Sequence, residues 1–396
     1  MSRRADMDFR PHPGAEEMRL AARALFDRFI TDNVVETIHE SGTVFDPAFH
    51  RALADNGWLT AGWPIEDGGQ GRNALDLAPF YEEAALVGAP LDISLTTMLV
   101  AETLRRVGTA EQRATVLKEI IGGRVISCLG FSEPDAGSDV AAVRTRAVRD
   151  ADEWVIDGQK MFTTGAQVAD YVFILTRTDP DVPKHRGLTL FLVPMSAPGI
   201  EIQRVDTLSG ERTNMTFYSS VRVSDSARVG EINGGWSVLM ITLAFERGMV
   251  PTAAGRCQRL LDQAVRWATD AIDESGLRLI DDPAVRRRLA TIAIKTEAAR
   301  LLGLRAVSIH AGGALPVVEG SMAKLYATEA LQEVVGSLLE VLGPAGVLHR
   351  DSGVAPMDGE FEHAYRHAAV ETIYGGTSEI QREIVASQGL GLPRST

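Results

Sequence analysis

The feature that most constrains the fold is a change in hydrophobic period that occurs at two points along the chain. From residue 14 to about 120, apolar residues recur three and four positions apart, which is helical spacing. Around residue 124 the period becomes two, and short apolar runs end at Asp, Gly, Pro or Ser, as strands do before turns. From Gly234 the helical period returns and persists to about residue 386.

This order predicts an α+β multidomain protein with a helical domain at 1–122, a central antiparallel β-domain at 123–233 and a helical bundle at 234–396. The β-domain should hold about six short strands. In the bundle, Asp282 and Pro283 predict the start of a helix, and Leu342-Gly343-Pro344 predicts the end of another.

Composition and charge exclude several classes of function. The formal net charge is −13 and no long basic block occurs, so the electrostatic attraction that nucleic acids and membrane surfaces require is missing. The densest basic run, RRR at 286–288, is predicted to be a solvated helix face, with a local anion contact as the alternative. Cys128 and Cys257 are the two cysteines, too few for a disulfide framework or a four-ligand metal site.

Cellular location follows from the same features. The segment MSRRADMDFR begins with basic residues but has no apolar run after it, and no segment approaches eighteen consecutive apolar residues. We therefore expect a cytoplasmic protein that neither spans nor binds a membrane.

Two polar, glycine-containing segments in the β-domain suggest a ligand site. FSEPDAGSD at 131–139 offers hydroxyls, the flexible Gly137 and backbone N–H groups outside helices, and DGQKMFTTGA follows at 157–166 with a predicted hairpin turn at Asp157-Gly158. Such residues let a backbone approach a flat polar ligand closely. A polar turn between strands is the simpler interpretation if the first segment is considered alone.

Together with IYGGTSEIQRE at 373–383, these segments resemble the signatures of the acyl-CoA dehydrogenase family of FAD-dependent enzymes. The similarity extends to PIEDGGQG and ARVGEINGGW, and it suggests the isovaleryl-CoA, long-chain or actinobacterial branches. Phe131 stands where a small aliphatic residue is usual, and Phe162 and Thr163 stand where tryptophan and isoleucine are common. The family's architecture is the same order of helices, sheet and helices.

The resemblance implies roles for individual residues around FAD. Residues that would contact the flavin or hold it from the C-terminal domain are Leu129, Phe131, Ser132, Phe162, Thr164, Thr377 and Glu379. Ser138 matches a position that touches the acyl-CoA substrate. No metal is implied.

One departure from the family concerns the catalytic base. The second signature usually has glutamate where this chain has Gly375, so either the enzyme is inactive or its base comes from elsewhere. In the segment LAFERGMV, Glu246 shares a helical face with Leu239, Leu243 and Val250, and a carboxylate there is either paired structurally or desolvated, with a raised pKa suited to a base. The segment resembles the one in which the isovaleryl-CoA and long-chain branches carry their glutamate.

The resemblance therefore implies α,β-dehydrogenation of an acyl-CoA thioester to the trans-2-enoyl-CoA. Glu246 would remove the α-proton, the flavin N5 would accept the β-hydrogen as hydride, the Gly375 amide would bind the thioester carbonyl, and Arg247 would orient the site. An electron-transfer flavoprotein is the expected electron acceptor. A homodimer or homotetramer is expected, because FAD in this family lies partly across a subunit interface.

A second departure leaves the assembly open. AIDESGLRLIDDP at 271–283 lacks the Arg-x-x-Phe-Gly motif that contacts the neighbouring subunit's FAD, so the adenosine end must be held differently or by a different subunit, as in heterotetrameric actinobacterial relatives. A flavin oxidase, a flavin monooxygenase of the same fold and a non-catalytic subunit are the alternative functions. The sequence does not define the length, branching or steroid character of the acyl group.

Overall fold

The computed structural model describes residues 13–246 and 251–393. Their contacts define two compact units, which are described separately. The sheet unit contains Phe29–Arg72 and Pro90–Glu246, and the helical unit contains Met1–Arg28, Asn73–Ala89 and Arg247–Thr396, less the residues outside the described ranges. The boundaries of the three domains expected from the sequence stay a prediction.

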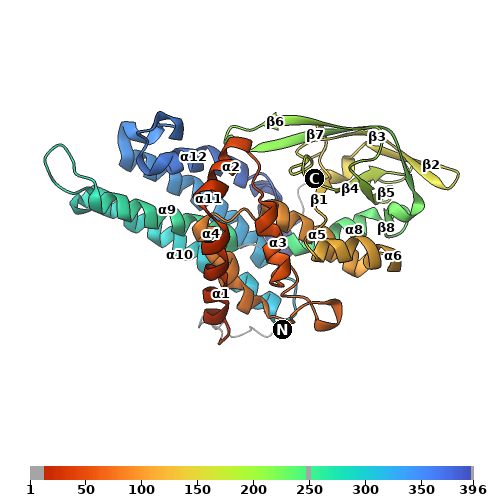
Figure 1. The fold of residues 1–396 in the computed structure, drawn as a ribbon, viewed down its shortest axis with the longest axis horizontal. Coiled ribbons are helices and arrows are strands. Elements are labelled where there is room, and N and C mark those ends of the chain that lie inside the picture. Colours follow the sequence, from red (N-terminus) through yellow and green to blue (C-terminus); the bar gives the residue numbers. More distant parts are fainter. Residues whose placement is uncertain (1–12, 247–250, 394–396) are drawn as a thin grey trace. The chain divides into compact units, whose positions relative to one another are not determined.

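The sheet unit is built on an eight-stranded sheet with the order β6-β7-β3-β2-β4-β5-β8, and β1 pairs with β4 beside this path (Figure 1). The strands are β1 (Ser127–Gly130), β2 (Arg146–Asp150), β3 (Glu153–Lys160), β4 (Tyr171–Arg177), β5 (Leu188–Pro194), β6 (Ile200–Asp206), β7 (Arg212–Ser224) and β8 (Arg228–Val229). Most pairs are antiparallel, as predicted, but β1 and β2 each run parallel to β4. The period-two pattern does not predict strand direction.

Strand β4 explains why the centre of the sheet is apolar without alternation. Phe173 and Leu175 belong to a core cluster that includes residues of helices α5 (Asp92–Val107) and α8 (Gly235–Glu246). Val172 and Ile174 belong to a cluster with Trp154 on β3 and strand residues of β7. All four β4 side chains are fully buried. Both faces of the strand are therefore covered, which favours a continuous apolar run.

The predicted hairpin at Asp157-Gly158 is wrong. These residues lie inside β3, at a register shift between Ile156 and Gly158 in the pairing with β7. The chain instead turns between β2 and β3, where Ala151 has φ 55°. Gly158 adopts φ 146°, and a Cβ there would lie 2.6 Å from Thr145 Oγ1, so glycine is required by the bulge rather than by a turn.

The remaining helices of the sheet unit follow the predicted helical period. They are α2 (Asp32–Ser41), α3 (Pro47–Asp55), α5 (Asp92–Val107), α6 (Ala110–Gln112), α7 (Lys118–Ile121) and α8 (Gly235–Glu246). Thr103 on α5 and Thr242 on α8 hydrogen-bond through their hydroxyls at 2.9 Å, and both are buried. The bond ties α8 to the core that underlies the sheet.

The helical unit is a bundle of α1 (Ala15–Phe29), α4 (Ala74–Val87), α9 (Pro251–Asp270), α10 (Pro283–Ala311), α11 (Val317–Leu342), α12 (Glu360–Glu371) and α13 (Ser378–Ile384). The Asp282 side chain caps α10 by accepting from the Ala284 N–H at 2.7 Å, and α11 ends at Leu342. Both helix boundaries confirm the sequence prediction. Residues of α9, α10, α11 and α12 make one apolar core.

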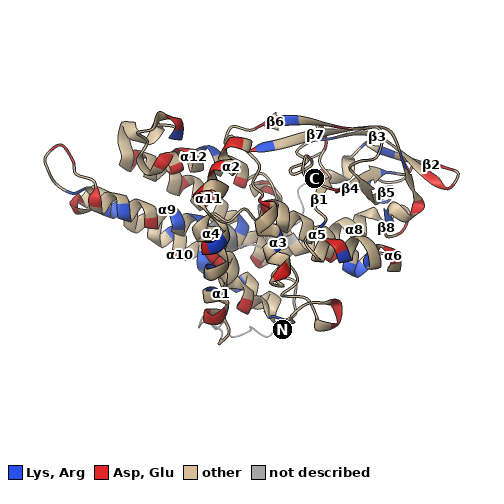
Figure 2. Cartoon of the chain, viewed as in Figure 1, with Lys and Arg blue, Asp and Glu red and all other residues tan. Residues whose placement is uncertain are grey.

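Charged residues are interspersed along α9 and α10 in the view of Figure 2. Arg286, Arg287 and Arg288 are exposed on α10, as predicted, and Arg288 pairs with Glu340. By length and composition alone, the segment Val317–Ser352 would be long and apolar enough to cross a membrane. It includes α11, whose buried Val334, Val335 and Leu338 belong to the core of the helical unit, and a core helix meets the same criterion.

Candidate active site

The segment 131–139 begins directly after β1. The Phe131 ring packs inward, edge-to-face on Phe173 with 6.0 Å between ring centroids. Within residues 13–246 and 251–393, neither the N–H nor the hydroxyl of Ser132 forms a hydrogen bond. Phe131 thus anchors the segment while Ser132 presents two free donors, and the contact of Ser132 with FAD stays a prediction.

The second segment meets the first through one backbone bond, in which the Met161 N–H donates to the Ser132 carbonyl at 2.9 Å. Beyond it, Phe162 and Thr164 are exposed and Thr163 between them is fully buried. Phe162 adopts φ 60°, an uncommon and strained conformation for an aromatic residue, and its side chain is 59% exposed. The strained backbone holds an apolar ring in solvent.

The other predicted residues of the sheet unit lie around this junction. Leu129 lies in β1 and packs partly against the core, while Ser138 is exposed on the loop. A Cβ built on Gly137 meets nothing within 4 Å, so the loop offers open space there. Free donors, an exposed ring and an open loop fit a flat, polar cofactor such as an isoalloxazine.

A buried ion pair that the sequence interpretation missed lies behind this junction. Lys160 Nζ donates to Glu133 Oε1 at 2.8 Å and to the Phe131 carbonyl at 3.1 Å, and the Lys160 side chain is fully buried. A signal for it exists in the sequence, because Lys160 continues the inward-facing positions of Trp154 and Ile156 at period two. A lysine on a buried strand face needs a partner.

The predicted base lies at the last described residue of α8. Trp236, Leu239, Met240 and Leu243 pack on the core of the sheet unit, and Glu246 follows Leu243 by three positions on the same helix. The apolar positions inferred from the sequence are therefore present as far as Leu243, and the role of Glu246 stays a prediction. Arg247 and Val250 lie outside the described residues.

Gly375, the position without a carboxylate, lies between α12 and α13 in the helical unit. Gly375 and Gly376 adopt φ 65° and 86°, a conformation that favours glycine. The Gly375 carbonyl accepts from Gln381 Nε2 at 3.0 Å, and the Gly376 carbonyl accepts from Lys324 Nζ at 2.8 Å. Among the residues that the structure describes, the Gly375 N–H has no acceptor.

Thr377 and Glu379, the two predicted cofactor residues of the helical unit, follow directly. The Thr377 hydroxyl caps α13 by accepting from the Ile380 N–H at 3.3 Å. The Glu379 carboxylate accepts hydrogen bonds from the backbone N–H of Glu379 and from the Thr377 hydroxyl. These bonds hold the pKa of Glu379 below its ordinary value. The start of α13 is thus an ordered, N–H-rich site next to Gly375.

The structure therefore groups the predicted site residues in two places. Leu129, Phe131, Ser132, Ser138, Phe162, Thr164 and Glu246 belong to the sheet unit, whereas Gly375, Thr377 and Glu379 belong to the helical unit. Glu133 and Lys160 join the first group.

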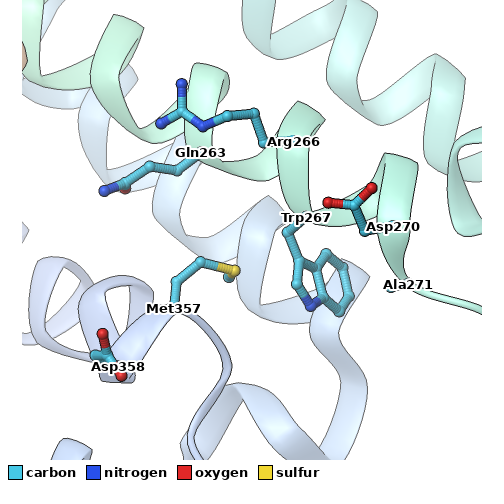
Figure 3. A pocket seen from close by; sticks show the side chains of 7 residues that line it. All are labelled: Gln263, Arg266, Trp267, Asp270, Ala271, Met357 and Asp358. Carbon is cyan, nitrogen blue, oxygen red and sulfur yellow. The ribbon is translucent and has the colours of Figure 1, made fainter.

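A cavity of about 610 Å³ lies elsewhere, at the C-terminal end of α9 in the helical unit (Figure 3). The cavity is lined by residues of α9, by the residue that follows α9 and by two residues of a later segment. They are Gln263, Arg266, Trp267 and Asp270, then Ala271, and finally Met357 and Asp358. None of the predicted site residues is among them.

The cysteines are inert in this structure. Cys128 and Cys257 are free and buried, and burial raises the pKa of each thiol to about 12. Within the described ranges, no group of three or more His, Cys, Asp or Glu side chains is arranged to hold a metal ion.

Comparison with known proteins places the whole chain in one group. Residues 13–124, 128–222 and 233–390 match the N-terminal, middle and C-terminal domain models of acyl-CoA dehydrogenases. The chain is 38% identical to the acyl-CoA dehydrogenase FadE26 of Mycobacterium tuberculosis, over 97% of this chain and 98% of that protein.

Solved structures give the same result. The fold matches a chain of the Tcur3481-Tcur3483 steroid ACAD with a TM-score of 0.90 and 37% identity, covering 98% of this chain and 100% of that chain. It matches a chain of the ChsE4-ChsE5 complex from Mycobacterium tuberculosis with a TM-score of 0.90 and 38% identity, at the same coverage.

Proposed function

Because the chain belongs to the acyl-CoA dehydrogenase family of FAD-dependent oxidoreductases, we propose that it converts an acyl-CoA thioester to the trans-2-enoyl-CoA with Glu246 as the base. The observation that carries this proposal is the complementary pair of positions 246 and 375. Glu246 ends a helix whose inner face is apolar, and Gly375 has no side chain. A carboxylate is therefore supplied at one position and missing at the other.

The apolar face of α8 suits Glu246 to proton abstraction. Leu239 is fully buried and Leu243 packs on the same core, so the described apolar positions of α8 extend to within one turn of Glu246. Desolvation disfavours the charged form and raises a carboxyl pKa, which makes the group a better base near neutral pH. Arg247, the next residue, is proposed to orient substrate beside it.

Gly375 is proposed to act through its backbone. Its N–H lacks an acceptor among the described residues, and its carbonyl is fixed by Gln381. A preoriented N–H that donates to the thioester carbonyl acidifies the α-proton and stabilises the charge that develops on the carbonyl oxygen. Ser138, exposed on the loop at 131–139, is proposed to contact the same substrate.

The cofactor contacts are proposed from the resemblance for each group of residues separately. Ser132 has free N–H and hydroxyl donors, Phe162 has an exposed ring, and Thr164 is exposed. Leu129 and Phe131 would contribute backbone contacts, and Thr377 and Glu379 would bind from the start of α13. When bound, FAD supplies the acceptor for the hydride that leaves the β-carbon.

We propose a steroid-type or branched acyl group and a two-chain assembly as the finer assignment. Two structural relatives are the Tcur3481-Tcur3483 steroid ACAD and the ChsE4-ChsE5 complex. The segment 271–283 contains a short turn held by the Asp273 carboxylate, which accepts from the N–H groups of Ser275 and Leu277. It lacks the Arg-x-x-Phe-Gly motif, so a second type of subunit would supply that contact. A homo-oligomer is the alternative.

Anaerobic titration of the purified FAD-loaded protein tests the function. Straight-chain, branched and steroid acyl-CoA thioesters would be added to separate samples, and the visible absorption of the flavin would be followed while the product is identified by mass spectrometry. The proposal predicts bleaching and an enoyl-CoA with two hydrogens fewer than the substrate. Absence of bleaching with every thioester, in the chain alone and with a partner subunit, would contradict it.

The acceptor distinguishes the alternative functions. Reoxidation by an electron-transfer flavoprotein, without peroxide, is expected for a dehydrogenase, and a cytoplasmic location agrees with such a carrier. Peroxide release in air without an added acceptor would favour a flavin oxidase. Oxygenation of the product would favour a monooxygenase, and bleaching that needs a second chain but not Glu246 would favour a non-catalytic subunit.

A further inference from the structure

The buried ion pair between Lys160 and Glu133 is connected to the backbone at each residue of the turn 131–133. Lys160 Nζ holds the Phe131 carbonyl at 3.1 Å, and the Met161 N–H holds the Ser132 carbonyl at 2.9 Å. The Glu133 backbone exchanges two bonds of 3.0 Å with Ala136. Lys160 and Met161, at the end of β3, therefore hold the turn through hydrogen bonds to two consecutive carbonyls, those of Phe131 and Ser132.

The Glu133 carboxylate extends this connection to the residues that directly precede β2. Its Oε1 accepts from Lys160 Nζ at 2.8 Å and from the Thr145 N–H at 2.9 Å, and its Oε2 accepts from the Arg144 N–H at 2.7 Å. Burial acts to raise the pKa of Glu133, but Lys160 and these donors lower it below its ordinary value. The carboxylate is thus charged and satisfied at both oxygens.

Lys160 keeps its charge in spite of complete burial. Burial lowers the pKa of its ammonium to about 8, while Glu133 acts in the opposite direction, so the group remains protonated at neutral pH. A buried ion pair gains little net stability, because the desolvation of both charges offsets their attraction, and apolar replacement of both partners is often neutral. Stability alone therefore does not explain the pair.

The geometry of the Phe131–Ser132 peptide explains it better. The structure contains no cis peptide bond among the described residues, and in a trans peptide the C=O and the next N–H point in opposite directions. Because Lys160 draws the Phe131 carbonyl inward, the Ser132 N–H is directed away from Lys160. That N–H has no partner in the described part of the chain.

We propose that Lys160, held by Glu133, is a positioning residue that aims the Ser132 N–H and hydroxyl at the flavin and keeps this turn in register with Phe162. The inference rests on the proposed placement of the cofactor at 129–132 and 162–164. Lys160 touches neither substrate nor cofactor in this account. Its effect passes through the Phe131 carbonyl and the adjoining peptide.

The test compares variants of the full-length, FAD-loaded protein by three readouts that need no substrate: the dissociation constant of FAD, the position and resolution of the visible flavin bands, and the flavin reduction potential. The main variant is the double substitution Lys160→Met with Glu133→Gln, which removes both buried charges and preserves volume. We expect it to fold with a thermal midpoint near that of the wild type. Its FAD dissociation constant should rise about tenfold, and its flavin bands should shift.

Two further variants separate positioning from stability. Glu133→Gln alone keeps the donor to the Phe131 carbonyl and should change the flavin readouts less than the double variant. Asp225→Asn is the matched control, because Asp225 accepts from Trp154 Nε1 at 2.8 Å at the opposite end of β3 and pairs with Arg228 at 2.9 Å. It should lower the thermal midpoint and leave the flavin readouts unchanged.

The proposal is overturned if the double variant binds FAD with the wild-type dissociation constant, spectrum and potential. It is also overturned if Asp225→Asn changes these readouts equally, since general loosening of the sheet would then explain them. A wild-type protein that binds FAD but is bleached by no acyl-CoA would contradict the proposed function while the Lys160 comparison still stands. Failure of the wild type to bind FAD would contradict both.

Discussion

The backbone N–H of Met161 donates to the carbonyl of Ser132 at 2.9 Å, and this bond joins two segments separated by strands β2 and β3. On one side of the bond Ser132 has free donors, and on the other Phe162 exposes its ring. Neither segment alone defines a ligand site. Their junction places a polar edge beside an apolar surface, which suits a ring system with a polar rim.

The backbone strain at Phe162 is expected to lower the stability of the protein while it presents the ring to the cofactor. Replacement by glycine removes the cost of φ 60° and should stabilise the FAD-free protein by about 1 kcal/mol, while the lost ring contact weakens FAD binding about tenfold. Thermal unfolding of the FAD-free protein and flavin titration measure the two effects. Ala151→Gly is the control, because Ala151 has φ 55° in the turn after β2 and should gain similar stability with unchanged FAD affinity. Equal FAD affinity in Phe162→Gly would show that the ring does not bind the cofactor.

Gly158 should tolerate no side chain. A Cβ there meets Thr145 Cα at 2.7 Å, and the Thr145 N–H donates to Glu133, so Gly158→Ala must displace the backbone at Thr145 that supports the turn. We expect a loss of about 3 kcal/mol in the free energy of unfolding, measured with denaturant. Gly137→Ala, which meets no atom within 4 Å, should change it by less than about 0.5 kcal/mol. Similar losses in the two variants would contradict the bulge geometry.

His50 predicts a loss of stability in mild acid. Its ring is buried on Ser94 with 2.8 Å between Nδ1 and Oγ, and burial together with the nearby Arg51 lowers its pKa from 6.5 to about 4. The folded state therefore binds fewer protons than the unfolded state between these values. The free energy of unfolding should keep its full value above pH 6.5. It should fall as the pH drops from 6.5 through 4, by up to about 3 kcal/mol.

Denaturant unfolding at several pH values measures this effect. His50→Gln, which has no group that titrates in this range, should lose less stability between pH 6.5 and pH 4 than the wild type. Identical pH dependence in the two proteins would assign the acid sensitivity to other groups.

The order of elements was predictable because hydrophobic period responds directly to secondary structure. Asp282 capping α10 and Leu342 ending α11 confirm that local rules fix helix boundaries where polar caps or Gly-Pro pairs occur. The parallel pairing of β1 and β2 with β4 was not predictable, since alternation gives the face of a residue but not the direction of its neighbour. Asp157-Gly158 is a residue pair that is typical of hairpin turns, so the sequence predicts a turn there. The bulge becomes visible only in the pairing of β3 with β7.

The site was predictable as far as its motifs extend along the chain. Ser132 and Gly375 have backbone N–H groups without a partner among the described residues, and Phe162 exposes its ring, while their contacts with ligands stay predictions. Lys160 lies inside the second motif but was not predicted, because the motif was interpreted through the residues expected to contact the cofactor. Its partner Glu133 lies 27 residues away, and no local rule connects them.

The assignment of the base is tested most directly by Glu246→Gln, which keeps the size of the side chain and removes its basicity. The FAD-loaded variant and the wild type would be mixed anaerobically with the acyl-CoA that bleaches the wild type fastest, and the flavin absorption would be followed. We predict that the variant binds FAD normally and bleaches at least about a thousandfold more slowly, as loss of a general base requires. Bleaching at the wild-type rate would contradict the assignment of Glu246.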